Sequence, residues 1–220
     1  CKLRLPQEGE WVRRAGRAQG WVCGGLPKGG SWNAAVRGVV TVDGGGGKVV
    51  MITSTSNGQV KQAAALAKRA KERRQTGLFV VEGRKMYEEA PEDWVEKVYV
   101  TEHYIEEYGQ PKGSCPWETV TEDVMRAMAD TQTPQGILAL VRQPRWKMED
   151  VWRGEKPHMI FLETLQDPGN LGTILRAGEG AGMTGLVMDA QTADIYNPKV
   201  IRSTMGSVFR MPFVCVPDLE

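Results

Sequence analysis

Apolar runs and segments with helical spacing alternate along the C-terminal part of the chain, and this alternation constrains the fold more than any other feature. The apolar runs lie at 159–163 (MIFLE), 185–189 (GLVMD) and 208–216 (VFRMPFVCV). Apolar residues between the first two runs recur at helical intervals, and Asn197-Pro198 begins a second helix that reaches about Gly206. Strands that alternate with helices form parallel sheets covered on both faces. The region 158–220 is therefore predicted to be a parallel α/β domain.

A second α/β unit is predicted at residues 51–142. Its first element is an alanine-rich helix over 57–74, and the run LFVVEG at 78–83 is predicted to be a buried strand. The elements expected after it are a helix at 85–90, a strand at 98–101, a helix at 121–129 and a strand at 137–141. Residues 143–157 form a predicted linker, in which Trp146 and Trp152 could join the domains or pack locally.

Residues 1–50 differ in composition from the rest of the chain. They hold 12 of the 26 glycines and show no sustained helical or strand period, so no folded domain is predicted there. The run GGGGK at 44–48 does not make a phosphate-binding loop, because Val49 stands where that motif needs Ser or Thr. We expect either a disordered extension or translated upstream sequence before a true start at Met51, and we favour the second.

Composition excludes several classes of protein. The four cysteines never form a C-x-x-C pair and only two histidines are present, so neither a disulfide framework nor a metal site is expected. No apolar run approaches the roughly 18 residues of a membrane span, and the start lacks a secretory signal. These features predict a cytoplasmic protein without a metal or a membrane partner.

Five cations crowd the end of the first predicted helix: Lys68, Arg69, Lys71, Arg73 and Arg74. Over about two turns they could contact several phosphates and give salt-dependent binding to RNA. A solvated charged face is the alternative for such a helix taken alone. Residues 82–107 hold nine acidic against three basic residues, so we expect RNA to approach the side of the basic helix.

Two stretches carry a resemblance to a known family. LETLQDPGNLGTILRAGEGAGMTGLVM (162–188) is similar to the first signature of the SpoU (TrmH-type) RNA ribose 2′-O-methyltransferases, and NPKVIRSTMGSVFRMPF (197–213) is similar to the second. The unit at 51–142 also resembles the ribosomal-protein-like RNA-binding domain often joined to this family's catalytic domain. The resemblance implies a small α/β RNA-binding domain followed by an incomplete parallel α/β domain of the SPOUT, trefoil-knot type.

The resemblance implies methyl transfer from S-adenosylmethionine to a ribose 2′-hydroxyl in structured rRNA or tRNA, without a metal. Asn170 and Arg176 match catalytic positions of the first signature, and Arg176 matches the proposed base. Because arginine stays protonated to above about pH 12, orienting a phosphate or stabilising a developing oxyanion is an equally open role. Glu163 could hold Arg176 in place, or it could be a surface carboxylate at a strand end.

The second signature supplies the remaining predicted site residues. By the resemblance, Thr204 and Gly206 contact the cofactor, and Arg202 contacts RNA from the same helix face as Gly206. Gly206 would permit the close approach of a ligand or a partner helix. Alternatively, it is the glycine that ends a helix.

A third family signature, a Pro-Met-x-Gly turn followed by an Asn-containing helix, does not occur within residues 1–220. In the family this region completes the knot and the cofactor pocket. We therefore expect the 220-residue chain neither to bind S-adenosylmethionine nor to methylate RNA, while the longer natural protein does both as a homodimer. Two other classes stay open, namely a non-catalytic RNA-binding protein and a base-modifying SPOUT methyltransferase.

Overall fold

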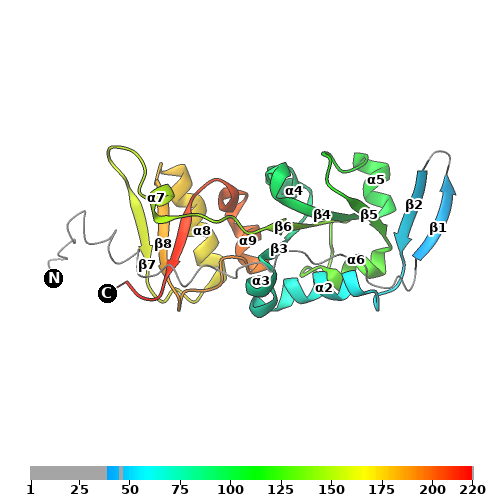
Figure 1. The fold of residues 1–220 in the computed structure, drawn as a ribbon, viewed down its shortest axis with the longest axis horizontal. Coiled ribbons are helices and arrows are strands. Elements are labelled where there is room, and N and C mark those ends of the chain that lie inside the picture. The colour runs from blue at the N-terminus through cyan, green and yellow to red at the C-terminus, as the bar shows by residue number, and fades with distance from the viewer. Residues whose placement is uncertain (1–38, 45–46, 220) are drawn as a thin grey trace.

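The computed structural model describes residues 39–44 and 47–219, with side chains from residue 51 onward. Two sheets lie one after the other along the long axis of the molecule, each with its own helices (Figure 1). The predicted pair of α/β units is therefore present. No helix in this part of the chain is long and apolar enough to cross a membrane.

The first sheet has six strands in the order β1-β2-β5-β4-β6-β3. The strands are β1 (Val39–Gly44), β2 (Gly47–Ile52), β3 (Leu78–Glu82), β4 (Val95–Val100), β5 (Trp117–Val120) and β6 (Ile137–Arg142). Strands β2, β5 and β4 run parallel, whereas β1 is antiparallel to β2, and β6 is antiparallel to both β4 and β3. The sheet is therefore mixed.

Helices cover both faces of this sheet (Figure 1). Helices α2 (Gly58–Lys68) and α6 (Glu122–Met128) bury Val60, Leu66 and Met125 on one face. Helices α4 (Arg84–Glu89) and α5 (Glu102–Tyr108) lie on the other face, and the short 3-10 helix η1 (Glu92–Trp94) leads into β4. The Thr121 hydroxyl accepts a hydrogen bond from the Val124 N–H at 3.4 Å, which confirms the predicted cap of α6.

The single helix predicted over 57–74 is wrong, because the chain breaks it in two. Arg69 has extended backbone angles, φ −123° and ψ 114°, and separates α2 from α3 (Ala70–Thr76). The Arg73 guanidinium donates to the carbonyls of Leu66 at 2.6 Å and Ala67 at 3.2 Å. These bonds satisfy carbonyls that a continuous helix would have bonded internally, so a tertiary contact outweighs the helical propensity of the segment.

The prediction that no regular structure precedes Met51 is also wrong for residues 39–44 and 47–50. These residues form strand β1 and the start of β2, paired in register from Val39 opposite Ile52 to Gly44 opposite Gly47. Valine-rich segments on either side of glycines favour such a hairpin, and the glycine content of the region obscured that signal. The expectation for residues 1–38 lies outside the described residues.

The second sheet contains β7 (Met159–Leu162), β8 (Gly185–Asp189) and β9 (Phe213–Val216), all parallel. Its predicted parallel character is therefore confirmed. The connections between these strands carry α8 (Pro168–Gly180) and α9 (Pro198–Thr204). The strand predicted over 208–216 is shorter than expected, because residues 207–209 form the 3-10 helix η2 (Ser207–Phe209).

The two helices of this second unit pack closely against each other at Gly172. A Cβ atom placed there would lie 1.9 Å from the Ser203 hydroxyl and 2.7 Å from the Val200 carbonyl oxygen. Only a glycine lets α9 approach α8 at this distance.

The linker is partly folded. Its residues 148–151 form the short helix α7 (Met148–Val151). Val151 is fully buried and packs against Gly185 of β8, where an added Cβ atom would lie 2.6 Å from the Val151 side chain. Trp146 packs edge-on against Trp94 of the first unit, with ring centroids 5.9 Å apart. The linker therefore contacts both units.

Candidate RNA-facing site

Asn170 and Arg176, the predicted catalytic pair, both lie on α8. The Asp167 carboxylate caps this helix by accepting a hydrogen bond from the Asn170 N–H at 2.6 Å, and Pro168 occupies its first turn. Both side chains are exposed. Six residues correspond to about one and two-thirds turns, so the two side chains leave the helix in different directions.

Glu163, the predicted partner of Arg176, follows β7 directly and is exposed. Within the described residues no ion pair joins Glu163 to Arg176. The structure thus presents the three predicted catalytic residues as exposed side chains of one sheet-and-helix unit.

Asp189, at the end of β8, organises the loop between Glu163 and Asn170, and sequence reasoning missed it. One carboxylate oxygen accepts from the Thr164 N–H at 2.9 Å and the Thr164 hydroxyl at 3.2 Å. The other accepts from the Thr192 N–H at 2.7 Å and hydroxyl at 2.6 Å. Burial alone would raise the pKa of Asp189, but hydrogen bonds from Thr192 and Thr164 bring it below its ordinary value.

These bonds tie the loop after β7 to the loop after β8. Thr164 adopts the left-handed conformation with φ 52°, which is unusual for a β-branched residue. A signal existed in the sequence, because an acidic residue that ends a buried strand requires hydrogen-bond donors when it is itself buried. Asp189 is 3% exposed.

Neither predicted cofactor residue presents an exposed polar side chain. Thr204 is fully buried, and its hydroxyl donates to the Ile201 carbonyl at 2.7 Å. Gly206 has φ 93° just after α9, and a Cβ atom there would lie 2.9 Å from atoms of both Arg210 and Glu89. This geometry favours Gly206 as a helix-ending glycine. As placed here, Thr204 and Gly206 offer no exposed side-chain donor or acceptor to S-adenosylmethionine.

Arg202, predicted to contact RNA, bridges the two units instead. One guanidinium nitrogen lies 2.8 Å from the Asp130 carboxylate, and another lies 4.0 Å from that of Glu82. Both acidic residues belong to the first unit, at the end of β3 and after α6. In this arrangement the Arg202 guanidinium is paired with protein carboxylates, so it is not free to bind a phosphate.

Arg73 is likewise removed from the predicted RNA-binding set. Its side chain is 3% exposed, and its guanidinium binds the Asp194 carboxylate at 2.9 and 2.7 Å as well as the two α2 carbonyls. Four of its five N–H donors have protein acceptors and the side chain is buried, so Arg73 is not an exposed cation that a phosphate could reach.

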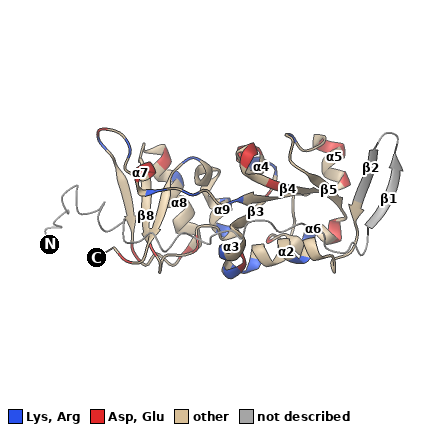
Figure 2. Cartoon of the chain, viewed as in Figure 1, with Lys and Arg blue, Asp and Glu red and all other residues tan. Residues whose placement is uncertain are grey.

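The other four predicted cations remain accessible. Lys68, Arg69, Lys71 and Arg74 are all exposed, and they surround the break between α2 and α3. We call these four residues the cationic patch. Figure 2 shows basic residues on α3 and the adjoining part of α2, with acidic residues on α4 and α5 across the sheet. An arrangement of this kind attracts polyanions to one side of the domain.

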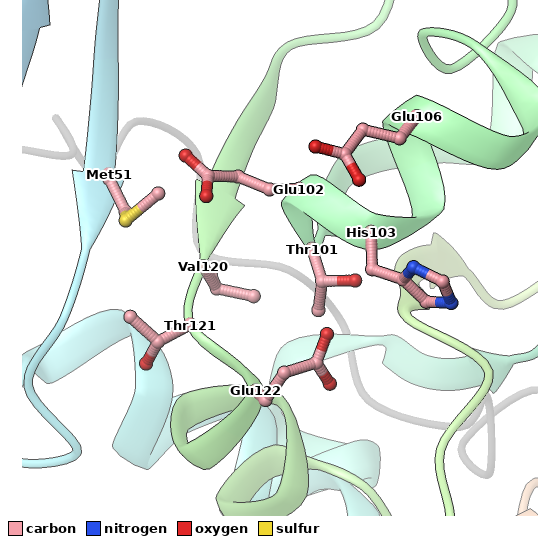
Figure 3. A pocket seen from close by; sticks show the side chains of 8 residues that line it. All are labelled: Met51, Thr101, Glu102, His103, Glu106, Val120, Thr121 and Glu122. Atoms are coloured by element: carbon pink, nitrogen blue, oxygen red, sulfur yellow. The ribbon is translucent and has the colours of Figure 1, made fainter.

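The far end of the first unit holds an acidic hollow of about 340 Å³ (Figure 3). It lies where the parallel strands β4 and β5 end and α5 and α6 begin, and Glu102, Glu106 and Glu122 line it with His103. Carboxylates repel phosphates, so this hollow does not suit RNA. Within residues 51–219 no group of three or more His, Cys, Asp or Glu side chains could hold a metal ion.

Comparison with known proteins agrees with this two-part arrangement. Residues 57–139 match the MRM3-like substrate binding domain, and residues 157–220 match the SpoU rRNA Methylase family. The 23S rRNA (guanosine(2553)-2'-O)-methyltransferase RlmP of Bacillus subtilis (strain 168) is 32% identical over 164 residues, which cover 74% of this chain and 64% of that protein. Human mitochondrial rRNA methyltransferase 3 is 32% identical over 151 residues, covering 64% of this chain and 36% of that protein.

Solved structures show the same likeness. The AdoMet-bound rRNA methyltransferase from Sinorhizobium meliloti matches with a TM-score of 0.65 and 28% identity, over 76% of this chain and 64% of that one. The chain thus spans less than two thirds of the length of each of these three relatives.

Proposed function

Because the chain belongs to the SpoU family of RNA methyltransferases and carries an MRM3-like substrate-binding domain, we propose that it supplies the RNA-facing part of a ribose 2′-O-methyltransferase. The whole protein would methylate a ribose in structured rRNA or tRNA, use S-adenosylmethionine and act as a homodimer of the trefoil-knot type. We place the junction between the substrate-binding domain (51–142) and the methyltransferase domain (158–220) in the linker 143–157.

The cationic patch carries this proposal. Four exposed cations stand together on a substrate-binding domain whose opposite side and far end are acidic. No exposed aromatic side chain accompanies them, since the large apolar side chains exposed among residues 51–219 are Tyr108, Trp152, Phe161 and Met205. The deep, narrow major groove of an RNA duplex keeps its base edges from side chains, so such cations bind mainly the phosphate backbone. We therefore expect the patch to position a folded RNA by its phosphates.

The exposed residues of α8 would act on the RNA thus positioned. S-adenosylmethionine, when bound by the whole protein, supplies an electrophilic methyl group. The Arg176 guanidinium remains charged at neutral pH, which suits it to orient a phosphate or to stabilise negative charge that develops on the ribose oxygen. The Asn170 amide can both donate and accept hydrogen bonds, which suits it to hold a ribose hydroxyl. Glu163 is near enough in sequence to act from the preceding loop.

Salt-dependent RNA binding tests the proposal on this chain. A fluorescent 20-base-pair RNA duplex is titrated at several salt concentrations, and log Kd is plotted against log salt. Each phosphate contact contributes a slope of about 0.9, so removing three cations with Lys68→Ala, Lys71→Ala and Arg74→Ala should lower the slope by about 2.7.

The matched control removes three exposed lysines elsewhere, with Lys61→Ala, Lys112→Ala and Lys156→Ala. The control changes the net charge equally but should leave most of the slope intact. Equal losses in the two triple variants would show that binding follows net charge alone and would refute the patch. Mapping of 2′-O-methylated riboses by mass spectrometry in cells lacking the whole protein then separates the methyltransferase from a protein that only binds RNA.

A further inference from the structure

The linker is not the only connection between the substrate-binding domain and the methyltransferase domain, because one hydrophobic core includes residues of both. Phe79 of β3 packs against Tyr196, with ring centroids 5.0 Å apart, and against Phe209 of η2 at 6.3 Å. Trp94 also contacts Phe209 at 6.3 Å. All four rings belong to, or pack against, a single buried cluster that includes residues of both sheets.

The hydrophobic effect is non-directional, so burial of apolar area alone discriminates weakly between orientations of the two domains. Charged pairs across an interface add directional contacts that favour one orientation. Three arginines at this interface make such contacts.

Arg73 provides the most buried of them. It reaches from α3 to Asp194, the residue that leads into α9, and its Nε and Nη2 atoms both bind one carboxylate oxygen, at 2.9 and 2.7 Å. The other Asp194 oxygen accepts from the Tyr196 N–H at 3.0 Å, so the carboxylate is itself held by the chain that precedes α9. Since Arg73 also caps α2, the same side chain links the cationic patch to the methyltransferase domain.

Arg202 makes the second contact, from α9 back to the substrate-binding domain. Its partner Glu82 is 8% exposed and accepts from the Asp130 N–H at 3.1 Å and from the Thr131 hydroxyl. The Arg202 Nη1 atom is buried and lies 4.0 Å from the Glu82 carboxylate. An isolated charge would be costly there, so Arg202 favours the one orientation that places it between Asp130 and Glu82.

Arg210 adds a third contact beyond α9. It binds Glu179 of α8 at 2.5 Å and also pairs with Glu89 of α4. The hydrogen bond from Arg210 lowers the pKa of Glu179 below its ordinary value. One of the three arginines, Arg202, belongs to α9, and this helix packs against β3 of the first sheet in the middle of the molecule (Figure 1).

We propose that α9 is the docking element of the substrate-binding domain, with Arg73 and Arg202 as positioning residues that hold the cationic patch in one place relative to Asn170 and Arg176. This inference rests on the proposed function, because it assigns the patch to RNA. The distance between patch and α8 would then select which ribose of a folded RNA reaches the exposed face of α8. Arg202 thus serves RNA recognition indirectly, through the position of the other domain.

Interdomain distance measured by pulsed electron paramagnetic resonance tests the proposal on the whole 220-residue chain. The four native cysteines are replaced by serine, and nitroxides are placed at Lys61→Cys on α2 and Ala177→Cys on α8, both exposed positions. The parent should give one narrow distance distribution. The double variant Asp194→Asn with Arg202→Met should broaden it by about twofold or more, since the apolar contacts that remain are less directional than the ion pairs that are removed.

Conservative replacement separates position from stability. Asp194→Glu with Arg202→Lys keeps the charges and should restore most of the narrow distribution, whereas a purely stabilising role would change the unfolding midpoint without changing the distances. Arg73→Leu is a second variant, and Asp123→Asn with Arg126→Met removes an exposed ion pair within one domain as the matched control. A broad distribution in the parent, or an unchanged one in the folded double variant, would overturn the proposal.

The RNA duplex titration keeps the two proposals apart. The double variant should bind the duplex within about twofold of the parent, because the patch itself is intact. Loss of binding only in the patch variant supports the proposed function, whatever the distances show. Failure of the patch variant to lose binding refutes the proposed function, while the distance measurement still decides whether the arginines fix the domains.

Discussion

Replacing Asp189 by asparagine should destabilise the chain strongly although the two side chains have nearly the same shape. Each carboxylate oxygen accepts one backbone N–H and one threonine hydroxyl. An asparagine can offer an oxygen to only one of these sites, and its NH2 group meets donors at the other in either orientation. The symmetry of the site means that no flip of the amide relieves the mismatch.

The magnitude follows from the bonds lost. Hydrogen bonds to a charged group contribute about 1.5–3 kcal/mol each, and a buried donor left without an acceptor costs about 1–3 kcal/mol. One site loses its acceptor, although its hydroxyl can rotate, and the other keeps neutral bonds in place of charged ones. We expect Asp189→Asn to lower the free energy of unfolding by about 3 kcal/mol.

Urea denaturation followed by far-UV circular dichroism at neutral pH measures this loss. Asp123→Asn is the matched control, because the Asp123 side chain is 80% exposed and its replacement should change stability by less than about 0.5 kcal/mol. If Asp189→Asn cost no more than the control, the four hydrogen bonds would not stabilise the fold and the reasoning would fail.

The same site predicts a pH dependence. Hydrogen bonds hold the folded pKa of Asp189 below its ordinary value of 3.8, so its contribution is present above that value and is lost as pH falls through the folded pKa. The difference in unfolding free energy between parent and Asp189→Asn should therefore be constant above about pH 5 and shrink in more acidic solution. A difference that grew on acidification would contradict the lowered pKa.

Three further substitutions test the packing of α8, the interdomain core and the end of α3. Gly172→Ala should destabilise the chain by about 2 kcal/mol in thermal unfolding, because the new Cβ atom would lie 2.7 Å from the Val200 carbonyl oxygen. The control Gly180→Ala should be neutral or slightly stabilising, because no atom lies within 4 Å of a Cβ atom there. Phe209→Ala should lower the free energy of unfolding in urea by about 3–5 kcal/mol, because a large buried side chain is removed. It should also separate one unfolding transition into two, since this ring contacts Phe79 and Trp94 of the other domain. A single unshifted transition would argue against a shared core. Gly77→Ala should cost about 1 kcal/mol, because Gly77 ends α3 with φ 67°, and an unchanged midpoint would contradict that conformation.

The sequence predicted those elements whose pattern is local. The strand at 185–189 was predicted with its observed bounds, and helix α6 begins at the predicted threonine cap. The order of strands and helices in the second domain was also predictable, because alternating periods leave few topologies. Helix α5 and strand β5 were not predicted, since both are short and lie in a polar, proline-containing region.

Tertiary contacts decided the features that the sequence could not reveal. The break at Arg69 interrupts a segment with good helical propensity, and nothing local marks it. Arg73 and Arg74 are neighbours of the same type, yet one is buried and the other exposed, because only Arg73 faces Asp194 more than a hundred residues later. The role of Arg202 depends in the same way on Glu82 and Asp130, which belong to another domain.

The break between α2 and α3 also changes the electrostatics of the patch. Like charges spaced three residues apart, as Lys68, Lys71 and Arg74 are, repel one another along an unbroken helix. Two helices have two carboxyl ends, each with a partial negative charge, and Lys68 lies in the last turn of one while Arg74 lies in the last turn of the other. Backbone dipoles thereby offset part of the repulsion that Lys68 and Arg74 experience, whereas Lys71 lies in the first turn of α3 and is not stabilised by them. The free protein can therefore hold several positive charges close together before a phosphate binds and neutralises them.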